Sequence, residues 1–400
     1  MTLDRPLITD RQRRVRLATR HGVHPDHRLG GLLDAVRAMT ALHATDASTV
    51  HLALHARTRR IRPADVDHAL YQERSLVKQL AMRRTLFVVD RDLLPAVLGS
   101  ASARVAATQH RTLVRTVERA RIARDGEEWV AAARTATLTL LAGAGPLPAR
   151  QIRAQVPELA GSLTYAPHKA YGGTVNIAPQ VLTLLGAEGS VVRGPNEGHW
   201  RASRPTWTLM ERWLGTPVHP LPSASGYTEL VRRWLWTFGP GTLEDLRWWL
   251  GATKTATRAA LQSAGAVPVR LEDGGTGWML PEDLEELPEV APWAALLPGL
   301  DPTTMGWKER GFYLDPQLAP YVFDTLGNGG TTAWWDGRIV GAWVQDEHAA
   351  VRVVPAPGVD LDVQARSALQ QEADRLTAWL DGVVIANVYK SQLMSGAALP

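Results

Sequence analysis

PADVDHALYQERSLVKQLAMRRTLFVV, residues 63–89, is the stretch of sequence that decides the fold class. Pro63 is suited to the first turn of a helix, and residues 63–80 are predicted to continue that helix. The β-branched and aromatic residues of MRRTLFVV, 82–89, then predict a strand. A basic pair, Arg83–Arg84, stands at the junction. Helices that lead into a strand through a basic junction are typical of a winged helix.

The residues before this stretch are also predicted to be helical. Residues 5–20 are basic with helical spacing, and apolar residues at helical spacing predict a second helix from residue 32 to about His43. A further helix carries Val50, Leu52 and Leu54. The first winged-helix region is therefore predicted over residues 1–110.

Two later regions repeat the order of three helices and a hairpin. Residues 127–207 end in GSVVRGPNEGHWRAS, 189–203, in which the return strand is predicted from His199. Residues 226–280 end in VPVRLEDGGTGWML, 267–280, with a turn at Gly274–Gly275. The repetition is one of pattern and not of residues.

The C-terminal part of the chain has a different sequence pattern from the rest. Residues 291–355 lose the helical period, and GGTTAWWDGRIVGAWV predicts a hairpin around Asp336–Gly337. An amphipathic helix over 361–381 and a final strand at VVIANVY, 383–389, are expected next. The predicted fold class is α+β and mainly helical, with about three tandem winged-helix modules and a small C-terminal β-barrel-like region. The regions are 1–110, 111–215, 216–290 and 291–400.

Composition excludes several classes of protein. The 400 residues include 44 Lys and Arg against 40 acidic residues, and no Cys, which rules out disulfides, thiolate nucleophiles and Cys-based metal sites. No stretch reaches the ~18 apolar residues that a membrane-spanning helix needs. The N-terminus is charged and unlike a signal peptide. We therefore expect a cytoplasmic, nucleoid-associated monomer with no membrane partner.

Basic residues in the predicted wings are the candidate DNA contacts. Only five of the basic residues are Lys, and Arg suits both phosphates and guanine edges. A surface Arg without a ligand is the ordinary alternative for any one of them, but three winged-helix modules in one chain favour DNA binding. The candidates in these modules are Arg83, Arg84, Arg193 and Arg201, with Arg204 and Arg258 beside them.

Common catalytic motifs are missing from the sequence. There is no HExxH, no Walker A loop and no GxSxG. His51 and His55 are four residues apart, a spacing that permits zinc ligation, but no third ligand is evident. A packed histidine pair is the ordinary interpretation, and neither a metal nor a cofactor is expected.

The segment ALHATD, 41–46, is the most distinctive candidate site. His43 and Thr45 are two residues apart where one predicted helix ends and the next begins, so both side chains can face one cleft. Asp46 or Ser48 is expected to cap the following helix. In the alternative, His43 satisfies a terminal carbonyl and Thr45 a loop amide.

The chain resembles the winged-helix alkylpurine DNA glycosylases of the AlkZ type over nearly its whole length. The segments that carry the resemblance are ALHATDASTVHLALHAR (41–57), MRRTLFVV (82–89), VVRGPNEGHW (191–200), LVRRWLWTFGPGTLEDLRWWLG (230–251), LLPGLDPTTMGWKER (296–310) and GNGGTTAWWDGRIVGAW (327–343). The resemblance implies tandem winged helices with a small β-barrel, and hydrolysis of the N-glycosidic bond of alkylated purines in double-stranded DNA. It also implies base excision repair, and self-resistance in producers of alkylating antibiotics, including bulky adducts and crosslinks.

The family motif is Gln, an apolar residue and Gln, and His43 and Thr45 occupy those two positions. A purine alkylated at N7 is already cationic and leaves without a general acid, so the enzyme has only to place a water at C1′. Neutral His43 can accept a proton from that water, Thr45 can hold it, and Asp46 can contribute its field. No Lys lies in the motif to form a Schiff base, which favours a monofunctional glycosylase.

Residues outside the motif also belong to the family-like segments. Lys308, Arg310 and Arg338 are candidate phosphate contacts, with surface ion pairs as the alternative. Asp301 is expected to anchor a turn, and Trp335 is the tryptophan best placed to act as a wedge in DNA. Two other functions stay open: a non-catalytic winged-helix DNA-binding or regulatory protein, and a protein that sequesters adducts without cutting.

Overall fold

The structure is a computed structural model that describes residues 5–165 and 173–395. The chain divides into two compact units, one formed by Met1–Val66 with Tyr227–Pro400 and one formed by Asp67–Gly226. Helices hold about half of the described residues, and the sheets are small. No helix in the described part of the chain is long and apolar enough to cross a membrane. The division into four regions stays a prediction.

The first unit has two sets of helices from distant parts of the chain. Its longer helices are α1 (Asp10–Arg20), α2 (Leu32–Ala38), α3 (Ala47–Arg57), α4 (Pro63–Tyr71, which runs into the second unit), α11 (Ser223–Phe238, which begins in the second unit), α12 (Leu243–Leu250), α13 (Lys254–Ser263) and α16 (Val363–Leu380). Its short helices are η1 (Pro25–His27), η6 (Pro281–Asp283), α14 (Pro302–Met305), α15 (Ala319–Val322) and η7 (Leu393–Ser395). Its strands are β1 (Leu7–Ile8), β2 (Leu42–His43), β10 (Val267–Leu271), β11 (Thr276–Met279), β12 (Ala294–Leu297), β13 (Thr332–Trp335), β14 (Arg338–Gln345) and β15 (Val351–Pro355).

The predicted second helix is shorter than expected. α2 ends at Ala38, and the amides of Met39 and Thr40 bond back to the carbonyls of Val36 and Arg37 at 3.2 and 3.1 Å. Thr40 then takes a φ of 60°, a left-handed conformation that stops the helix. His43 therefore lies in the short strand β2, and the prediction of a helix as far as His43 is wrong.

The decisive stretch 63–89 was predicted correctly at its ends and wrongly in its middle. α4 stops at Tyr71, Arg74 has a φ of 58°, and LVKQL forms strand β3 (Leu76–Leu80) instead of continuing the helix. β3 pairs antiparallel with β4 (Leu86–Asp90), with Leu80 opposite Leu86. Cross-strand pairing outweighs the helical spacing of this segment, and the basic pair becomes the turn of a hairpin.

Three helices and a hairpin follow in residues 226–280, as predicted. Thr242 caps α12 in a reciprocal capping box with Asp245, and Gly251 ends that helix in a left-handed conformation. β10 and β11 form the hairpin, and β1 adds to it in parallel beside β10. Ile8, Val269, Leu271 and Met279 form the small core under this sheet.

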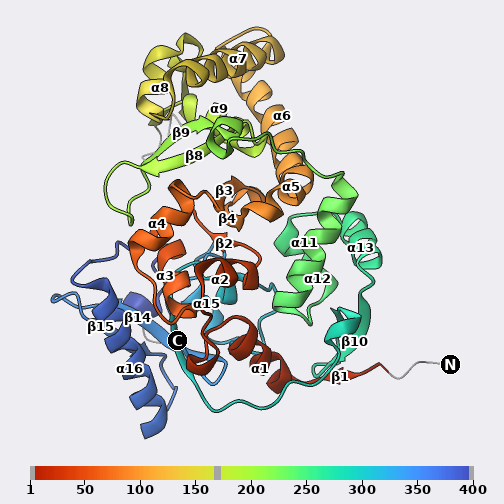
Figure 1. Cartoon of the computed structure of the whole chain (residues 1–400), viewed down its shortest axis with the longest axis vertical. Helices are drawn as coiled ribbons and strands as arrows, with labels where there is room; N and C mark the ends of the chain where they lie inside the picture. The colour runs from red at the N-terminus through yellow and green to blue at the C-terminus, as the bar shows by residue number, and fades with distance from the viewer. Residues whose placement is uncertain (1–4, 166–172, 396–400) are drawn as a thin grey trace. The chain divides into compact units, whose positions relative to one another are not determined.

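The C-terminal region is an open antiparallel meander. Its strand order is β12-β13-β14-β15, and α16 packs against β12, β13 and β15. Figure 1 shows α16 beside β15. The predicted turn at Asp336–Gly337 joins β13 to β14, where Trp335 is opposite Arg338. Among the described residues the sheet is not closed, so the expected barrel-like region is not confirmed.

The final strand expected at 383–389 does not form. These residues have no strand assignment, and Val384 and Val388 are exposed. The Gln345 side chain instead donates to the carbonyl of Val383 and accepts from the amide of Ile385, at 3.0 and 2.8 Å. One amide side chain thus replaces the strand ladder that a sheet would supply.

The second unit is built around three long helices. Its helices are α5 (Leu94–Val97), α6 (Ala103–Arg119), α7 (Gly126–Ala144), α8 (Ala149–Gln155), α9 (Ala178–Ala187) and α10 (Met210–Leu214), with short η2 (Met82–Arg84), η3 (Arg91–Leu93), η4 (Leu98–Ser102) and η5 (Pro157–Ala160). Its remaining strands are β5 (Leu147–Pro148), β6 (Ser162–Tyr165), β7 (Gly173–Asn176), β8 (Val191–Asn196) and β9 (Pro205–Leu209).

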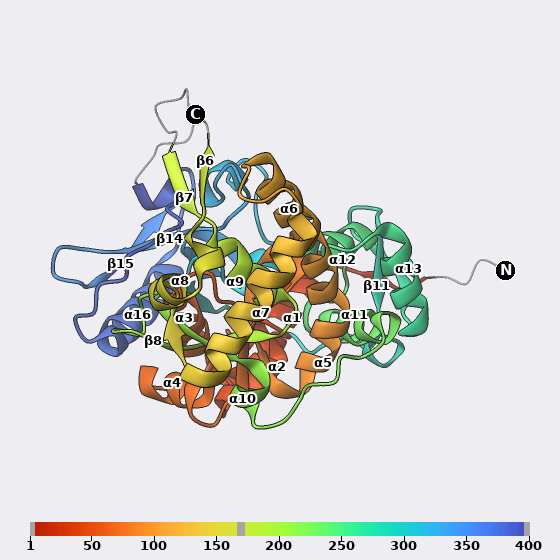
Figure 2. The ribbon, with the colours of Figure 1, turned by 90° about the horizontal axis from the view of Figure 1, so that it is seen from above.

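Helix α6 packs against α7 and α9 in this unit (Figure 2), and their apolar faces enclose a core that includes Val117, Leu141 and Leu185. The predicted helices and hairpin of 127–207 are present as α7, α8, α9 and β8–β9. The return strand starts at Pro205 and not at His199, because a loop intervenes between the two strands.

Candidate functional site

The ALHATD segment leads directly into helix α3. Asp46 is the residue that caps this helix: its Oδ1 accepts from the Ser48 amide at 2.9 Å and from the Ser48 hydroxyl at 2.8 Å. Burial raises the pKa of the Asp46 carboxyl above its usual value, although the hydrogen bonds from Ser48 oppose that shift. The cap therefore holds a carboxylate in a partly dry environment immediately after Thr45.

The two motif residues differ in exposure. His43 is 3% exposed, whereas the Thr45 side chain is exposed. Thr45 is therefore open to solvent, whereas His43 is shielded from it. A common cleft for the two side chains stays a prediction. A large ligand would contact Thr45 before it contacts His43.

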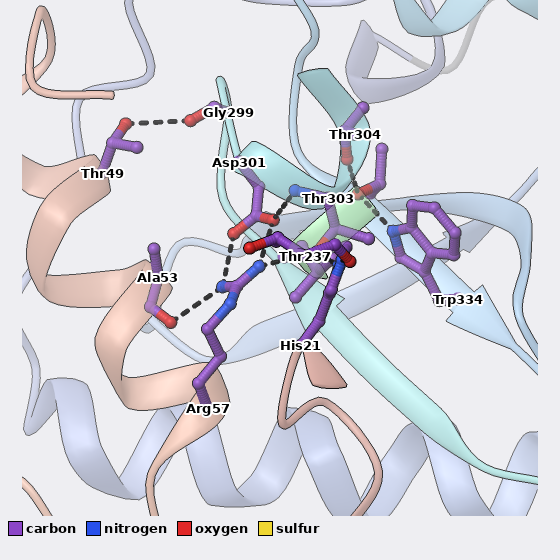
Figure 3. A network of polar contacts seen from close by, with 12 residues as sticks. His21, Thr49, Ala53, Arg57, Thr237, Gly299, Asp301, Thr303, Thr304 and Trp334 are labelled. Atoms are coloured by element: carbon purple, nitrogen blue, oxygen red, sulfur yellow. Dashed lines mark hydrogen bonds and ion pairs between the residues drawn. The ribbon is translucent and has the colours of Figure 1, made fainter. Parts of the chain in front are cut away.

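Helix α3 is fixed at both ends to the segment after β12. Near its start, the Thr49 hydroxyl donates to the Gly299 carbonyl at 2.8 Å. At its end, Arg57 donates to both carboxylate oxygens of Asp301, at 2.8 and 2.6 Å (Figure 3). Both side chains of this ion pair are 0% exposed. These bonds hold the helix that the motif enters in one position.

The ion pair continues into a buried hydrogen-bond chain. Arg57 also donates to the Thr303 hydroxyl at 2.7 Å, and that hydroxyl lies 2.9 Å from Nδ1 of His21 (Figure 3). Nε2 of His21 lies 3.0 Å from the Thr237 carbonyl, which can only accept, so this nitrogen carries the proton and Nδ1 accepts from Thr303. Burial, reinforced by the charge of Arg57, lowers the pKa of His21 to about 3, so the ring is neutral.

Asp301 has the structural role that the sequence predicted. Its carboxylate caps α14 by accepting from the Thr303 amide at 2.8 Å, which anchors the turn after β12. The sequence did not identify Arg57 as its partner. Arg57, at the end of the largely apolar segment ASTVHLALHAR (47–57), was the available signal, since a buried guanidinium needs a carboxylate.

The phenol of Tyr389 lies within electrostatic reach of Asp46. The pKa of Tyr389 is raised by burial and by the negative charges of Asp46 and Asp324. The motif surroundings thus combine an exposed hydroxyl, a partly buried carboxylate and a phenol, which can position and polarise a water molecule. No pattern in the sequence indicated Tyr389.

The histidine pair on α3 is packed into the protein. Nδ1 of His51 lies 3.2 Å from the Ala47 carbonyl, and the His55 ring stacks on Trp379 with centroids 4.6 Å apart. Burial lowers the pKa of His55 to about 2. Within residues 5–165 and 173–395, no three His, Cys, Asp or Glu side chains are grouped to hold a metal ion.

Four of the predicted DNA contacts lie in the second unit. Arg83 and Arg84 form the turn between β3 and β4, with φ values of 53° and 59°, and Arg84 is exposed. Arg201 is exposed in the loop between β8 and β9. Arg193 is only partly exposed, and its guanidinium lies 5.1 Å from the centroid of the Trp207 ring.

The other three predicted contacts lie in the first unit. Lys308 donates to Glu244 at 2.7 Å, so its charge is locally compensated. The guanidinium of Arg310 lies 4.1 Å from the Phe323 ring centroid. Arg338 is exposed. Their roles in DNA binding stay predictions.

The predicted wedge, Trp335, is only partly exposed, on β13. Trp236 on α11 is 50% exposed, although the Arg20 guanidinium lies 4.8 Å from its ring centroid. Trp236 therefore presents more of its ring to solvent than Trp335 does.

Comparison with known proteins gives two findings. The sequence matches the family described as DNA glycosylase AlkZ-like over residues 36–379, a range that contains the motif and the Arg57–Asp301 pair. The fold is similar to that of the Streptomyces sahachiroi DNA glycosylase AlkZ, with a TM-score of 0.71 and 21% identity over 92% of this chain and 96% of that chain. No curated protein sequence is significantly similar.

Proposed function

Because the chain belongs to the AlkZ-like DNA glycosylase family, we propose that it hydrolyses the N-glycosidic bond of purines alkylated at N7 in double-stranded DNA. The family match over residues 36–379 carries this proposal. The substrate class extends to bulky antibiotic adducts and crosslinks, so the enzyme serves base excision repair and self-resistance.

The reaction requires little acid catalysis. An N7-alkylated purine is cationic, and it takes the electron pair of the breaking bond and leaves as a neutral base. Water then adds its oxygen to C1′ of the sugar and loses one proton. The protein has to place that water and stabilise the developing positive charge on the sugar.

The motif supplies groups for both tasks. Thr45 is exposed and holds the water through its hydroxyl, while His43, shielded from solvent, accepts the proton. The Asp46 carboxylate is a second acceptor, and when ionised it stabilises the positive sugar through its field. No lysine lies in this segment, which supports a monofunctional enzyme that leaves an intact abasic strand.

A duplex carrying one N7-methylguanine tests the proposal. After incubation and mild alkali, the strand should break at the lesion faster with protein than without it, and it should stay intact without alkali. His43→Ala and Thr45→Ala should each slow excision, by at least about 10-fold if they hold the water. His348→Ala and Thr325→Ala, at exposed positions in the same unit, are the matched controls.

A non-catalytic DNA-binding protein is the second candidate, and the burial of His43 favours it. Such a protein would bind the duplex with strong salt dependence and leave no alkali-labile site. If both motif variants excise at the wild-type rate, the residue assignment is wrong even though the activity stands.

A further inference from the structure

One face of helix α6, in the second unit, carries a row of exposed arginines. The four that we call the arginine stripe are Arg104, Arg111, Arg115 and Arg119. With 3.6 residues per turn, their positions fall within an arc of about 80° of the helix circumference. At 1.5 Å per residue, the stripe runs along about 22 Å of the helix. It is therefore a straight line of positive charge on one surface.

The charge of the chain is concentrated in this segment. Two more exposed arginines, Arg121 and Arg124, follow the stripe. Residues 103–124 contain six arginines and one acidic residue, Glu118, which give a net charge of +5. The whole chain of 400 residues has a net charge of only +4. The rest of the protein is thus close to neutral, and this surface is its strongest attraction for an anion.

These six arginines are not neutralised within the protein. Within residues 5–165 and 173–395, no carboxylate oxygen lies within 4.0 Å of their guanidinium groups. Other exposed arginines of this unit do pair, as Arg150 does with Glu197 at 2.9 Å. Like charges four residues apart, such as Arg111 and Arg115, also destabilise a helix. A bound polyanion would remove this repulsion.

The opposite face of α6 fixes the helix in the unit. Ala106, Leu113, Val114 and Val117 are buried, and α6 packs against α7 and α9. The exposed face consists of Arg, Thr, Ala and Glu118 and has no large apolar or aromatic side chain. A membrane-binding helix needs apolar side chains to insert into lipid, and single-stranded nucleic acid is held by aromatic stacking. This face therefore suits phosphates rather than lipid tails or bases.

We propose that the arginine stripe binds the phosphate backbone of duplex DNA without regard to base sequence. Each guanidinium can bond two phosphate oxygens through its planar fork. A duplex carries one phosphate per ~1.7 Å of its axis, so about 22 Å offers roughly 13 phosphates to four arginines. The choice of duplex DNA as the polyanion rests on the proposed function. The stripe holds undamaged DNA as well as damaged DNA, and so keeps the enzyme on the duplex while it searches for a lesion.

Salt-dependent binding of the full chain to a short undamaged duplex, followed by fluorescence anisotropy, tests the stripe. A variant with all four stripe arginines changed to Gln keeps a good helix former at each position. It should bind at least about 10-fold more weakly and reduce the slope of log K against log salt by about 3–4, because each lost phosphate contact lowers that slope by ~0.9.

The matched control makes the same change of charge at four exposed arginines that are already paired with carboxylates. These are Arg62, Arg150, Arg352 and Arg366. Changing all four to Gln should alter the slope by less than about 1. Thermal unfolding of both variants checks that each is folded.

Crosslinking locates the contact on the helix. The chain has no cysteine, so Thr108→Cys, at an exposed position within the stripe, can be labelled alone with benzophenone maleimide. On illumination it should crosslink to the duplex in higher yield than the same label at Thr139→Cys, an exposed position on α7. Equal yields from the two positions would contradict the proposal.

The proposal is overturned if the wild-type protein does not bind the duplex, if the slope of the stripe variant is unchanged, or if the control variant loses as much. It is also overturned if the stripe binds phosphatidylserine vesicles or oligo(dT) but not the duplex. Excision plays no part in these measurements. Normal excision with an unchanged slope would contradict the stripe alone, whereas stripe-dependent binding without excision of N7-methylguanine would contradict the enzyme activity alone.

Discussion

Asp301→Asn tests whether the Arg57–Asp301 pair holds helix α3 in place. Asparagine keeps the shape of the side chain and an oxygen that can cap α14, but it leaves the Arg57 charge without a partner. Because both side chains are 0% exposed, the expected loss is about 3–5 kcal/mol of the free energy of unfolding. That loss is a large part of the total free energy of unfolding of a folded protein, which is ~5–15 kcal/mol.

Urea unfolding followed by circular dichroism and tryptophan fluorescence measures this loss. Asp360→Asn breaks the Arg366 pair, whose side chains are 97% and 67% exposed, and serves as the matched control with a cost below about 1 kcal/mol. Arg57→Met combined with Asp301→Asn should be less destabilised than the sum of the two single variants. A loss under about 1 kcal/mol for Asp301→Asn, or strict additivity, would refute the reasoning.

Three further predictions follow from other parts of the chain. The pKa of His21 falls from 6.5 to about 3 on folding, so stability present above pH 6.5 should be lost as the pH falls toward 3, and His21→Gln should flatten that part of the stability curve measured by thermal unfolding. Gly341→Ala should cost about 1–3 kcal/mol because its Cβ would lie 2.2 Å from the Val354 carbonyl oxygen, whereas Gly30→Ala, with no atom within 4 Å, should leave Tm unchanged. Arg84→Ala should weaken DNA binding for all sequences and reduce the slope of log K against log salt by about 1, and an unchanged slope would remove Arg84 from the interface.

Local signals in the sequence predicted the elements whose ends they mark. In residues 226–280, Thr242 with Asp245 starts a helix, Gly251 ends it, and Gly274 turns the hairpin. These signals act within a few residues, so their effect does not depend on the rest of the chain. The predicted helices and hairpin are accordingly present.

Tertiary pairing decided the elements that the sequence did not predict. LVKQL, 76–80, has helical spacing but becomes a strand because β4 pairs with it. His43 was expected at a helix end, but the left-handed Thr40 stops α2 and places His43 in a strand. For the candidate site, Asp46 as the cap was among the predicted options, whereas the partnership of Arg57 with Asp301 joins residues 244 positions apart and leaves no local trace.

The division of the first unit into two chain segments affects its synthesis. Helix α3 leaves the ribosome 244 residues before Asp301, the carboxylate that neutralises its buried arginine. At ~5–20 residues per second, that interval lasts roughly 12–50 s. Throughout it, the apolar surface of α3 has no native cover from the C-terminal segment, and the second unit, a continuous stretch of chain, is completed before Asp301 is synthesised. The nascent chain should therefore depend on chaperones at this stage, and the motif should acquire its final position only near the end of translation.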